Sequence, residues 1–240
     1  MTRGLILIAA LLGVSLAQSS AVLEVFVPAP LPKTIKPNPV PKTMSELPSG
    51  VSLGGSCSPS LKNLQVPTDV SNAKADAMIS KQIQVIVNAD QAARRGKIAS
   101  NLETEDLRLR TALMPLIPRA TSQNFAGIAL VFQHGGCVPH WMLANYMALM
   151  AIKTDGEAKK TSSYIDPKWL YASTLDRALM NSKRAQKYGT QYFSSSNNEC
   201  TRLYVVDPRT TDAERKSYNV PTLEEAIARA KMFATPGCKP

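Results

Sequence analysis

The sequence predicts a mainly α-helical protein: a single compact domain of about five to seven helices that follows a signal peptide and a proline-rich linker. Three observations predict this fold class. Apolar residues recur at helical spacing in several segments after residue 71, and residues that favour helix N-caps precede some of these segments. About 170 residues then remain for one domain, which is enough to bury a sizeable core.

The first 17 residues have the pattern of a secretory signal peptide. Arg3 gives a short basic start, and the apolar stretch 5–17 carries no charge and ends in small residues. Cleavage is expected after Ala17 or, alternatively, after Ala21. The stretch is shorter than the roughly 20 apolar residues of a membrane-spanning helix. We therefore expect a secreted or periplasmic protein with no membrane association after signal cleavage.

Residues 18–70 are predicted to form a disordered linker rich in Pro, Gly and Ser. Seven prolines lie between positions 28 and 48, and glycines at 50, 54 and 55 continue the loop character. Such a composition favours an extended chain over a packed core. The helical domain is therefore expected to span 71–240.

The chain is basic. It contains 28 Lys and Arg residues against 18 Asp and Glu residues, which gives a net charge of +10 at pH 7. This excess favours an unknown polar or anionic ligand as the partner. The positive charges are scattered, and aromatic residues are not interleaved with them, so specific nucleic-acid binding is not expected. We expect a monomer.

Four cysteines, at positions 57, 137, 200 and 238, predict two disulfides in an exported protein. The sequence leaves three pairings open, of which we favour Cys57 with Cys137 and Cys200 with Cys238. The chain has no Cys-x-x-Cys motif and only two histidines, so neither a zinc site nor another cofactor is expected.

Cys137 has a second interpretation, as a nucleophilic thiol. It stands at a predicted helix start, three residues from both His134 and His140, where the helix dipole favours a thiolate. Oxidation in an exported protein favours the disulfide instead.

The first predicted helix, 72–98, carries an acidic residue on its apolar face. Ile79, Ile83 and Ala93 follow the helical repeat, and Asp90 falls on the same stripe. A buried carboxylate needs a partner, and Arg94, one turn further on, is the nearest cation. The pair is interpreted either as part of a site or as an ion pair that orders the helix end.

The segment 125–133 fits either a helix or a buried strand, and it ends at Gln133 and His134. Gly135 and Gly136 then break the element. The helix that follows, 140–152, is apolar on nearly all sides and is predicted to be the most buried. His134 is interpreted as a general acid or base beside this break or, alternatively, as a hydrogen-bonding cap.

A third helix is predicted to begin with Asp166 as its N-cap and Pro167 in its first turn. It carries Asp176 and Arg177, and a charged segment, 181–191, forms its C-terminal end. Gly189 is interpreted as the C-cap of this helix.

Two capping boxes, Thr211 with Glu214 and Thr222 with Glu225, predict two further helices near the end of the chain. Both helices are interpreted as structural. In the final helix, 223–233, the inner side is expected to carry Ala226, Ile227, Ala230 and Phe233.

The order of the polar motifs resembles a bacterial family of uncharacterised, mainly helical domains of unknown function. The resemblance covers roughly residues 76–233 and rests on Asp90-Gln91-x-x-Arg94, Gln133-His134, Asp176-Arg177 and Gln186-x-Tyr188-Gly189-Thr190-Gln191. It implies no activity. Members usually carry acidic residues after Gln-His, where this chain has Gly136 and Val138, which argues against a metal or acid-base role that would need those carboxylates. Cysteine is not part of the family pattern, which favours a disulfide for Cys137.

Two hypotheses follow for the function. In the first, a polar pocket around Asp90, His134 and the turn 188–191 binds a polar ligand or serves structure. Its ligand-binding residues are expected to be Gln91, Arg94, Gln133, Arg177, Gln186, Tyr188, Thr190 and Gln191. In the alternative, the protein is a secreted hydrolase that uses His134 with Asp90 or Asp176 as an acid-base pair. No nucleophile with a convincing base is evident, which favours the first hypothesis.

Overall fold

The computed structural model describes residues 20–22, 57–67, 77–96, 101–154, 166–194, 200–233 and 238. These ranges contain seven α-helices, two 3-10 helices and two two-stranded sheets. The predicted mainly α-helical fold is confirmed. The expected signal peptide, residues 1–17, and most of the expected linker up to residue 56 lie outside the described residues.

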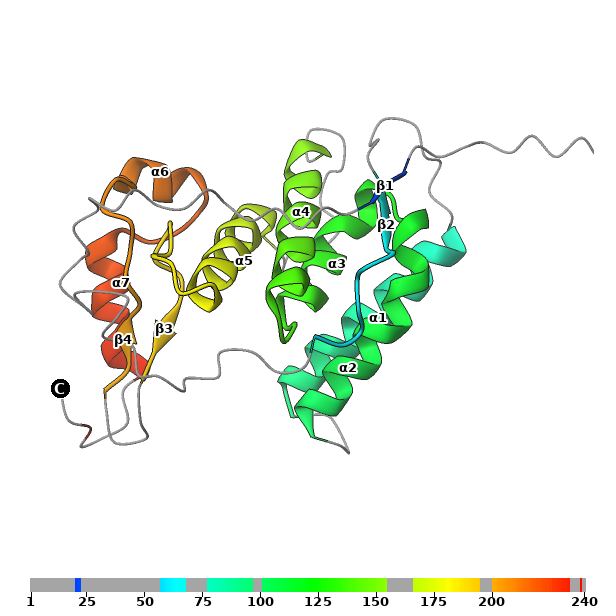
Figure 1. Ribbon diagram of the computed structural model, residues 1–240, viewed down its shortest axis with the longest axis horizontal. Coiled ribbons are helices and arrows are strands. Elements are labelled where there is room, and N and C mark those ends of the chain that lie inside the picture. Colours follow the sequence, from blue (N-terminus) through cyan, green and yellow to red (C-terminus); the bar gives the residue numbers. More distant parts are fainter. Residues whose placement is uncertain are drawn as a thin grey trace, which may run out of the picture.

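Five longer helices form most of the molecule (Figure 1). Helices α1 (Ala77–Arg94) and α2 (Leu102–Leu113) lie side by side at one end, and the 3-10 helix η2 (Met114–Arg119) leads into α3 (Ser122–Gln133). Helix α4 (Val138–Thr154) packs between α3 and α5 (Pro167–Asn181). His134, in the turn between α3 and α4, contacts α1 through Asp90 and α2 through Arg110.

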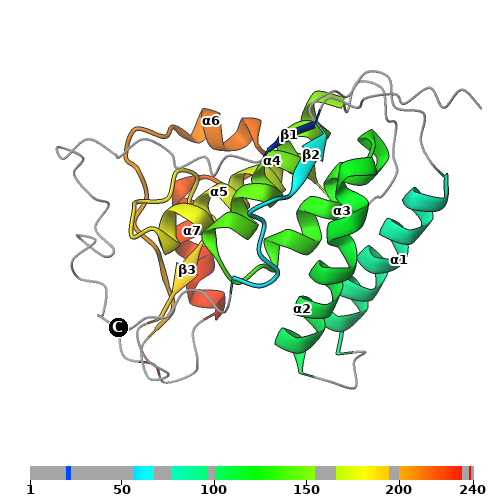
Figure 2. The same ribbon diagram turned by 45° about the vertical axis from the view of Figure 1, so that its right-hand side comes forward.

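The opposite end of the molecule is built from short elements (Figure 2). Strand β3 (Tyr192–Phe193) pairs antiparallel with β4 (Arg202–Leu203), and α7 (Leu223–Ala230) packs on β4. Helix α6 (Asp212–Ser217) and the 3-10 helix η3 (Lys231–Phe233) complete this end. Gln186 adds a single parallel bridge to Val206.

The segment 125–133 is a helix. A capping box of Thr121 and Asn124 starts α3. Phe125, Ile128 and Phe132 then recur at helical spacing, and each is at most 1% exposed. One continuous buried face of α3 accounts for the apolar stretch that is also compatible with a strand.

Side chains cap the later helices as predicted. Asp166 accepts hydrogen bonds from the backbone N–H groups at the start of α5. Thr222 and Glu225 form a complete capping box at α7. At α6 only half of the predicted capping box forms: the Thr211 hydroxyl accepts a hydrogen bond from the backbone N–H of Glu214, whereas the Glu214 side chain pairs with Lys187.

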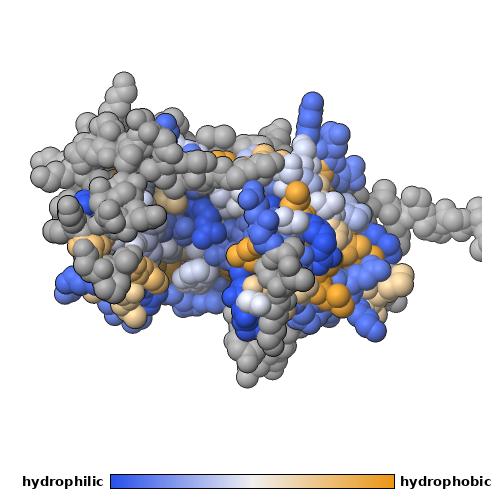
Figure 3. All heavy atoms as spheres, turned by 90° about the horizontal axis from the view of Figure 1, so that it is seen from below, coloured by the Kyte–Doolittle hydropathy of each residue, from blue (hydrophilic) through white to orange (hydrophobic). Residues whose placement is uncertain are grey.

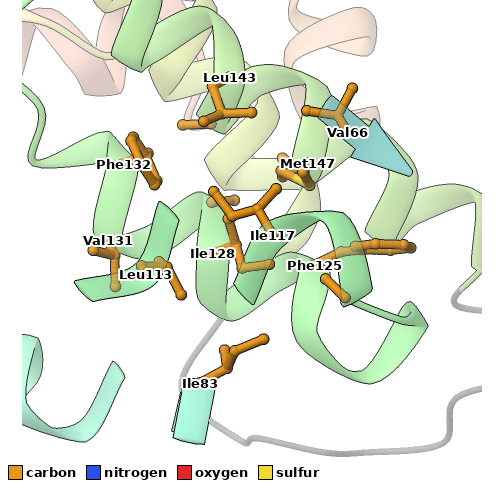
Figure 4. Packing of buried hydrophobic residues seen from close by; sticks show 14 of the residues in the cluster. Val66, Ile83, Leu113, Ile117, Phe125, Ile128, Val131, Phe132, Leu143 and Met147 are labelled. Carbon is orange, nitrogen blue, oxygen red and sulfur yellow. The ribbon is translucent and has the colours of Figure 1, made fainter. Parts of the chain in front are cut away.

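The main hydrophobic core lies among α1 to α4 and η2 (Figure 4). Leu113, Ile117, Ile128 and Leu143 come from four successive elements, and each is fully buried. Because α4 packs on two neighbouring helices, residues around most of its circumference are buried, as the sequence predicts. Removal of these side chains from water is the main source of folding free energy.

The expected linker is too long, because residues 57–67 belong to the folded domain. Leu61, Leu64 and Val66 are buried in the main core. Strand β2 (Gln65–Pro67) also pairs antiparallel with β1 (Ser20–Val22). These three apolar residues are spaced by three and two positions, which matches neither a helical nor a strand period. The Gly and Ser residues around them therefore favour a loop in the sequence analysis.

Two predicted helix ends are wrong. Helix α1 ends at Arg94 instead of residue 98, because Gly96 adopts a left-handed φ of 72°. Helix α5 ends at Asn181, where Ser182 is the C-cap, so Gly189 does not cap it. Lys183 takes the positive φ that ends this helix.

The predicted inner side of the final helix is partly wrong. Ala226 and Ala230 are buried as expected, but Ile227 and Phe233 are 42% and 55% exposed. The α-helix ends at Ala230 and continues as the 3-10 helix η3, which changes the angular spacing of the last residues.

Both favoured disulfides, Cys57–Cys137 and Cys200–Cys238, are present, with Cα atoms 5.1 Å and 4.9 Å apart. The Cys137 sulfur is therefore not a free thiol in this state. None of the described helices combines the length and apolar character that a membrane span requires. Both observations are compatible with a secreted or periplasmic protein.

The surface seen from below is largely hydrophilic, with apolar patches on the side of α1 and α2 (Figure 3). Met78, Val85, Ile86 and Leu116 help to line an apolar groove of about 460 Å³ along α1. Met78 and Val85 are 64% and 59% exposed, so these large apolar side chains face solvent.

Leu113→Ala should lower the free energy of unfolding by about 3 kcal/mol, because the substitution removes buried methyl groups and leaves a cavity. Leu107→Ala is a matched control on the same helix, since Leu107 is 39% exposed. We expect a change below about 1 kcal/mol for the control. Urea denaturation followed by circular dichroism measures both, and equal losses would contradict the assigned core.

Candidate functional site

The predicted site residues lie in two groups joined at the C-terminal end of α3. The first group surrounds the contact between Asp90 on α1 and His134, which follows α3. The second group surrounds Asp176 on α5. Gln133 and Arg177 connect the two groups.

Asp90 is almost fully buried, with 1% of its surface exposed, and its carboxylate is paired as the sequence predicts. Its Oδ1 lies 2.9 Å from Nδ1 of His134 and 3.5 Å from the guanidinium of Arg94. The Gln91 side chain donates a 2.8 Å hydrogen bond to the other carboxylate oxygen. Both oxygens are therefore satisfied, which a buried carboxylate requires.

The Asp90 contact determines which nitrogen of His134 is available. An ionised carboxylate can only accept, so Nδ1 of His134 carries the hydrogen and Nε2 keeps a lone pair when the ring is neutral. The His134 side chain is 20% exposed, whereas Asp90 behind it is 1% exposed. A partly exposed imidazole is thus held by a buried carboxylate.

Arg94 lies between two carboxylates. Its guanidinium contacts Asp106 on α2 as well as Asp90. The side chain is 24% exposed, so the ion pair reaches the surface beside His134. Its Nε is buried and has no hydrogen-bond partner among the described residues.

Two arginines from neighbouring helices donate to the last carbonyls of α3. Arg110 on α2 donates a 2.9 Å hydrogen bond to the His134 carbonyl, and Arg177 on α5 donates to the Gln133 carbonyl. The final carbonyls of a helix have no partner within the helix, so these guanidinium groups act as its C-terminal cap. Burial lowers the pKa of both arginines, and the charge of Arg94 lowers that of Arg177 further.

The residues next to the cap lock the turn in place. The Gln133 side chain reaches the Ser173 hydroxyl on α5 at 3.4 Å. Gly135 is required sterically, since a Cβ at this position would lie 2.3 Å from Cβ of His140. The absence of a side chain at Gly135 therefore permits the close approach of α3 and α4.

Asp176 organises the Tyr188–Gln191 segment and does not contact His134 in the described structure. It is fully buried, and its carboxylate accepts hydrogen bonds from the backbone N–H groups of Lys187, Tyr188 and Thr190 at 2.7, 2.8 and 3.0 Å. The Thr190 hydroxyl adds a fourth at 2.8 Å. Burial raises the pKa of Asp176 to about 6, against the opposing effect of these four hydrogen bonds.

The two glutamines of the motif hold the same segment together. Gln186 donates to the carbonyls of Gln191 and Tyr204 and accepts a 2.8 Å hydrogen bond from the Gln191 backbone. Gln191 in turn donates to the Ser173 carbonyl and accepts from Arg177 at 3.1 Å. Their side-chain donors and acceptors are therefore bonded to the protein.

Tyr188 and Gly189 have packing and backbone roles. The Tyr188 ring is 1% exposed and lies within 5.0 Å of the Tyr218 ring, centre to centre. Gly189 has a φ of 84°, which favours glycine. The buried guanidinium of Arg215 donates to the Tyr188 carbonyl at 3.1 Å. This explains the aromatic residue and the glycine without a ligand.

Sequence reasoning missed several residues that complete these groups. Arg110 and Arg215, only 4% and 2% exposed, both bond to backbone carbonyls that are distant in sequence. Asp106 and Ser173 also enter only through tertiary contacts. A cation among buried helix positions, as at Arg110 between Leu109 and Leu113, is the one local signal that could have identified such a residue.

Among the described residues, one group of Cys, His, Asp and Glu side chains has the spacing of a metal site: Cys57, Cys137 and His140. The two sulfurs are joined in a disulfide and offer no thiolate in this state.

Comparison of the chain with protein-family models, with curated proteins and with solved structures gives no significant match. The resemblance to a bacterial helical family therefore stays a prediction.

Asp176→Asn should lower the free energy of unfolding at pH 8 by about 2–4 kcal/mol, because a neutral amide cannot accept all four hydrogen bonds and would direct N–H groups at backbone donors. Glu224→Gln, which removes one charge from an exposed residue of α7, is the control and should change stability by less than about 0.5 kcal/mol. Denaturant titration of both variants is the measurement. A loss no larger for Asp176→Asn than for Glu224→Gln would contradict the assigned role.

Proposed function

We propose that this protein is an exported binding domain that holds a small anionic ligand at His134 and Arg94. The observation that carries the proposal is the 2.9 Å contact between buried Asp90 and the partly exposed His134. It leaves Nε2 as the imidazole nitrogen without a contact to Asp90, and Arg94, whose side chain is 24% exposed, pairs with the same carboxylate.

The charges around His134 favour an anion. Arg94, Arg110 and Arg177 approach the end of α3, against the carboxylates of Asp90 and Asp106. Within the described ranges, neither Arg110 nor Arg177 has a carboxylate within 4.0 Å; both bond to carbonyl oxygens. Three arginines against these two carboxylates leave an excess of positive charge at the end of α3, which attracts negatively charged molecules.

In this proposal the Tyr188–Gln191 segment supports the site and does not contact the ligand. Its polar groups bind Asp176, Gln186 and the protein backbone, which leaves few donors for a ligand. Through Gln191 it positions Arg177, and Arg177 caps the carbonyl that precedes His134.

A second candidate function is general acid-base catalysis of hydrolysis by His134. A buried carboxylate that fixes the imidazole through Nδ1 and leaves Nε2 towards solvent is the arrangement used by catalytic Asp–His pairs. Asp90 is the carboxylate that fits this role, because it contacts His134, whereas Asp176 binds the turn 187–190. The attacking group would have to be water, since the described structure brings no Ser, Thr or Cys nucleophile to the pair.

Inorganic phosphate at low ionic strength is a direct probe of the binding proposal. We expect saturable shifts of the His134 ring protons in NMR spectra of the wild type. His134→Gln and Arg94→Gln should each weaken binding, measured by calorimetry, at least tenfold, or about 1.4 kcal/mol. Arg108→Gln is the matched control: it removes the same charge from the neighbouring helix α2, where Arg108 pairs with Glu105 and is 60% exposed.

Equal phosphate affinity in all four proteins would contradict the binding proposal. An aryl phosphate or aryl ester tests the catalytic alternative: turnover that is lost in Asp90→Asn and His134→Gln, while both variants keep the wild-type circular dichroism spectrum, would favour catalysis. Binding without turnover would favour the binding domain alone.

A further inference from the structure

The disulfide between Cys57 and Cys137 lies beside a buried histidine. A ring nitrogen of His140 and the two Sγ atoms all lie within 4.8 Å of one another. Cys137 directly precedes α4, and His140 is in the first turn of that helix. Cys57 is exposed and His140 is fully buried, so the cluster connects the surface with the interior.

The hydrogen bonding of His140 leaves one nitrogen with a lone pair. Its Nε2 lies 2.8 Å from the carbonyl oxygen of Pro59. Because a carbonyl can only accept, Nε2 carries the hydrogen and Nδ1 does not. Nδ1 is buried and has no hydrogen-bond partner among the described residues. In the neutral ring, Nδ1 therefore keeps its lone pair.

This arrangement is unusual for a histidine with a purely structural role. A buried acceptor without a partner lowers the stability of the protein. In contrast, a metal-binding histidine typically donates its second nitrogen to a backbone carbonyl, which fixes the ring and directs the other nitrogen to the metal. The Pro59 contact supplies that orientation.

We propose that reduction of the Cys57–Cys137 disulfide creates a Zn²⁺ site formed by both thiolates and Nδ1 of His140. In this step a dithiol reductant is oxidised to its cyclic disulfide as the protein disulfide is reduced, and two protons are released when both thiolates bind Zn²⁺. The donor set of two thiolates and one imidazole suits zinc, with a water molecule as the fourth ligand.

The distances permit this change with small movements. Zinc bonds of about 2.0–2.3 Å in tetrahedral geometry place ligand atoms roughly 3.3–3.8 Å apart. The sulfurs must separate from their bonded distance, and a ring nitrogen of His140 already lies within 4.8 Å of both. The fold thereby places His140 beside a cysteine pair that spans 80 residues of the sequence.

The test uses the full mature chain with the substitutions Cys200→Ser and Cys238→Ser, so that one cysteine pair remains. After anaerobic reduction with a phosphine, which competes weakly for metal, dialysis against limiting Zn²⁺ should leave one zinc per chain, and the oxidised protein should retain none. Cobalt in place of zinc should give the near-ultraviolet charge-transfer absorption of thiolate ligands.

His140→Gln should weaken zinc binding at least tenfold. Cys57→Ser leaves one thiolate and should abolish the cobalt charge-transfer absorption that is expected for two thiolate ligands. Circular dichroism with and without zinc establishes that each variant is folded. Three results would overturn the proposal: zinc retention by the oxidised protein, unchanged zinc affinity in His140→Gln, or a reduced protein that stays unfolded in the presence of zinc.

Discussion

The structure depends on how the C-terminal end of α3 is satisfied in the middle of the molecule. The last carbonyls of a helix lack partners within the helix, and burial without partners would be costly. Arg110 from α2 and Arg177 from α5 donate to the carbonyls of His134 and Gln133. Because these donors come from opposite neighbours, the cap also joins the two ends of the fold.

The candidate site follows from this cap. With its backbone held by Arg110, His134 can direct its ring towards Asp90 on α1. Arg177 continues to Gln191, which belongs to the segment that surrounds Asp176. Consecutive residues of α5 thus serve two networks: Asp176 orders the Tyr188–Gln191 turn, and Arg177 transmits that order to α3. These hydrogen bonds and ion pairs form one polar network that holds the helices together. Within it, the side chains of Arg94 and His134 are partly exposed and are available for a ligand.

Local patterns predicted what is local in this fold. Helical spacing identified the buried position of Asp90 and its contact with Arg94, and capping residues located the starts of α5 and α7. The Asp90 contact with His134 and the Asp176 contact with Thr190 span 44 and 14 residues, so no helical period could reveal them. The interpretation of Gly189 as a helix cap is wrong for the same reason. A glycine indicates that a positive φ is possible, but the local sequence does not show the buried Asp176 carboxylate that binds this turn.

The most direct test of the account is the tautomer of His134. Long-range ¹H–¹⁵N NMR of the ring, at a pH where the imidazole is neutral, distinguishes a protonated Nδ1 from a protonated Nε2. We predict hydrogen on Nδ1 in the wild type and a mixture of tautomers in Asp90→Asn, with the spectrum of His140 unchanged. Hydrogen on Nε2 in the wild type, or no change in Asp90→Asn, would contradict the claim that Asp90 orients His134 towards a ligand.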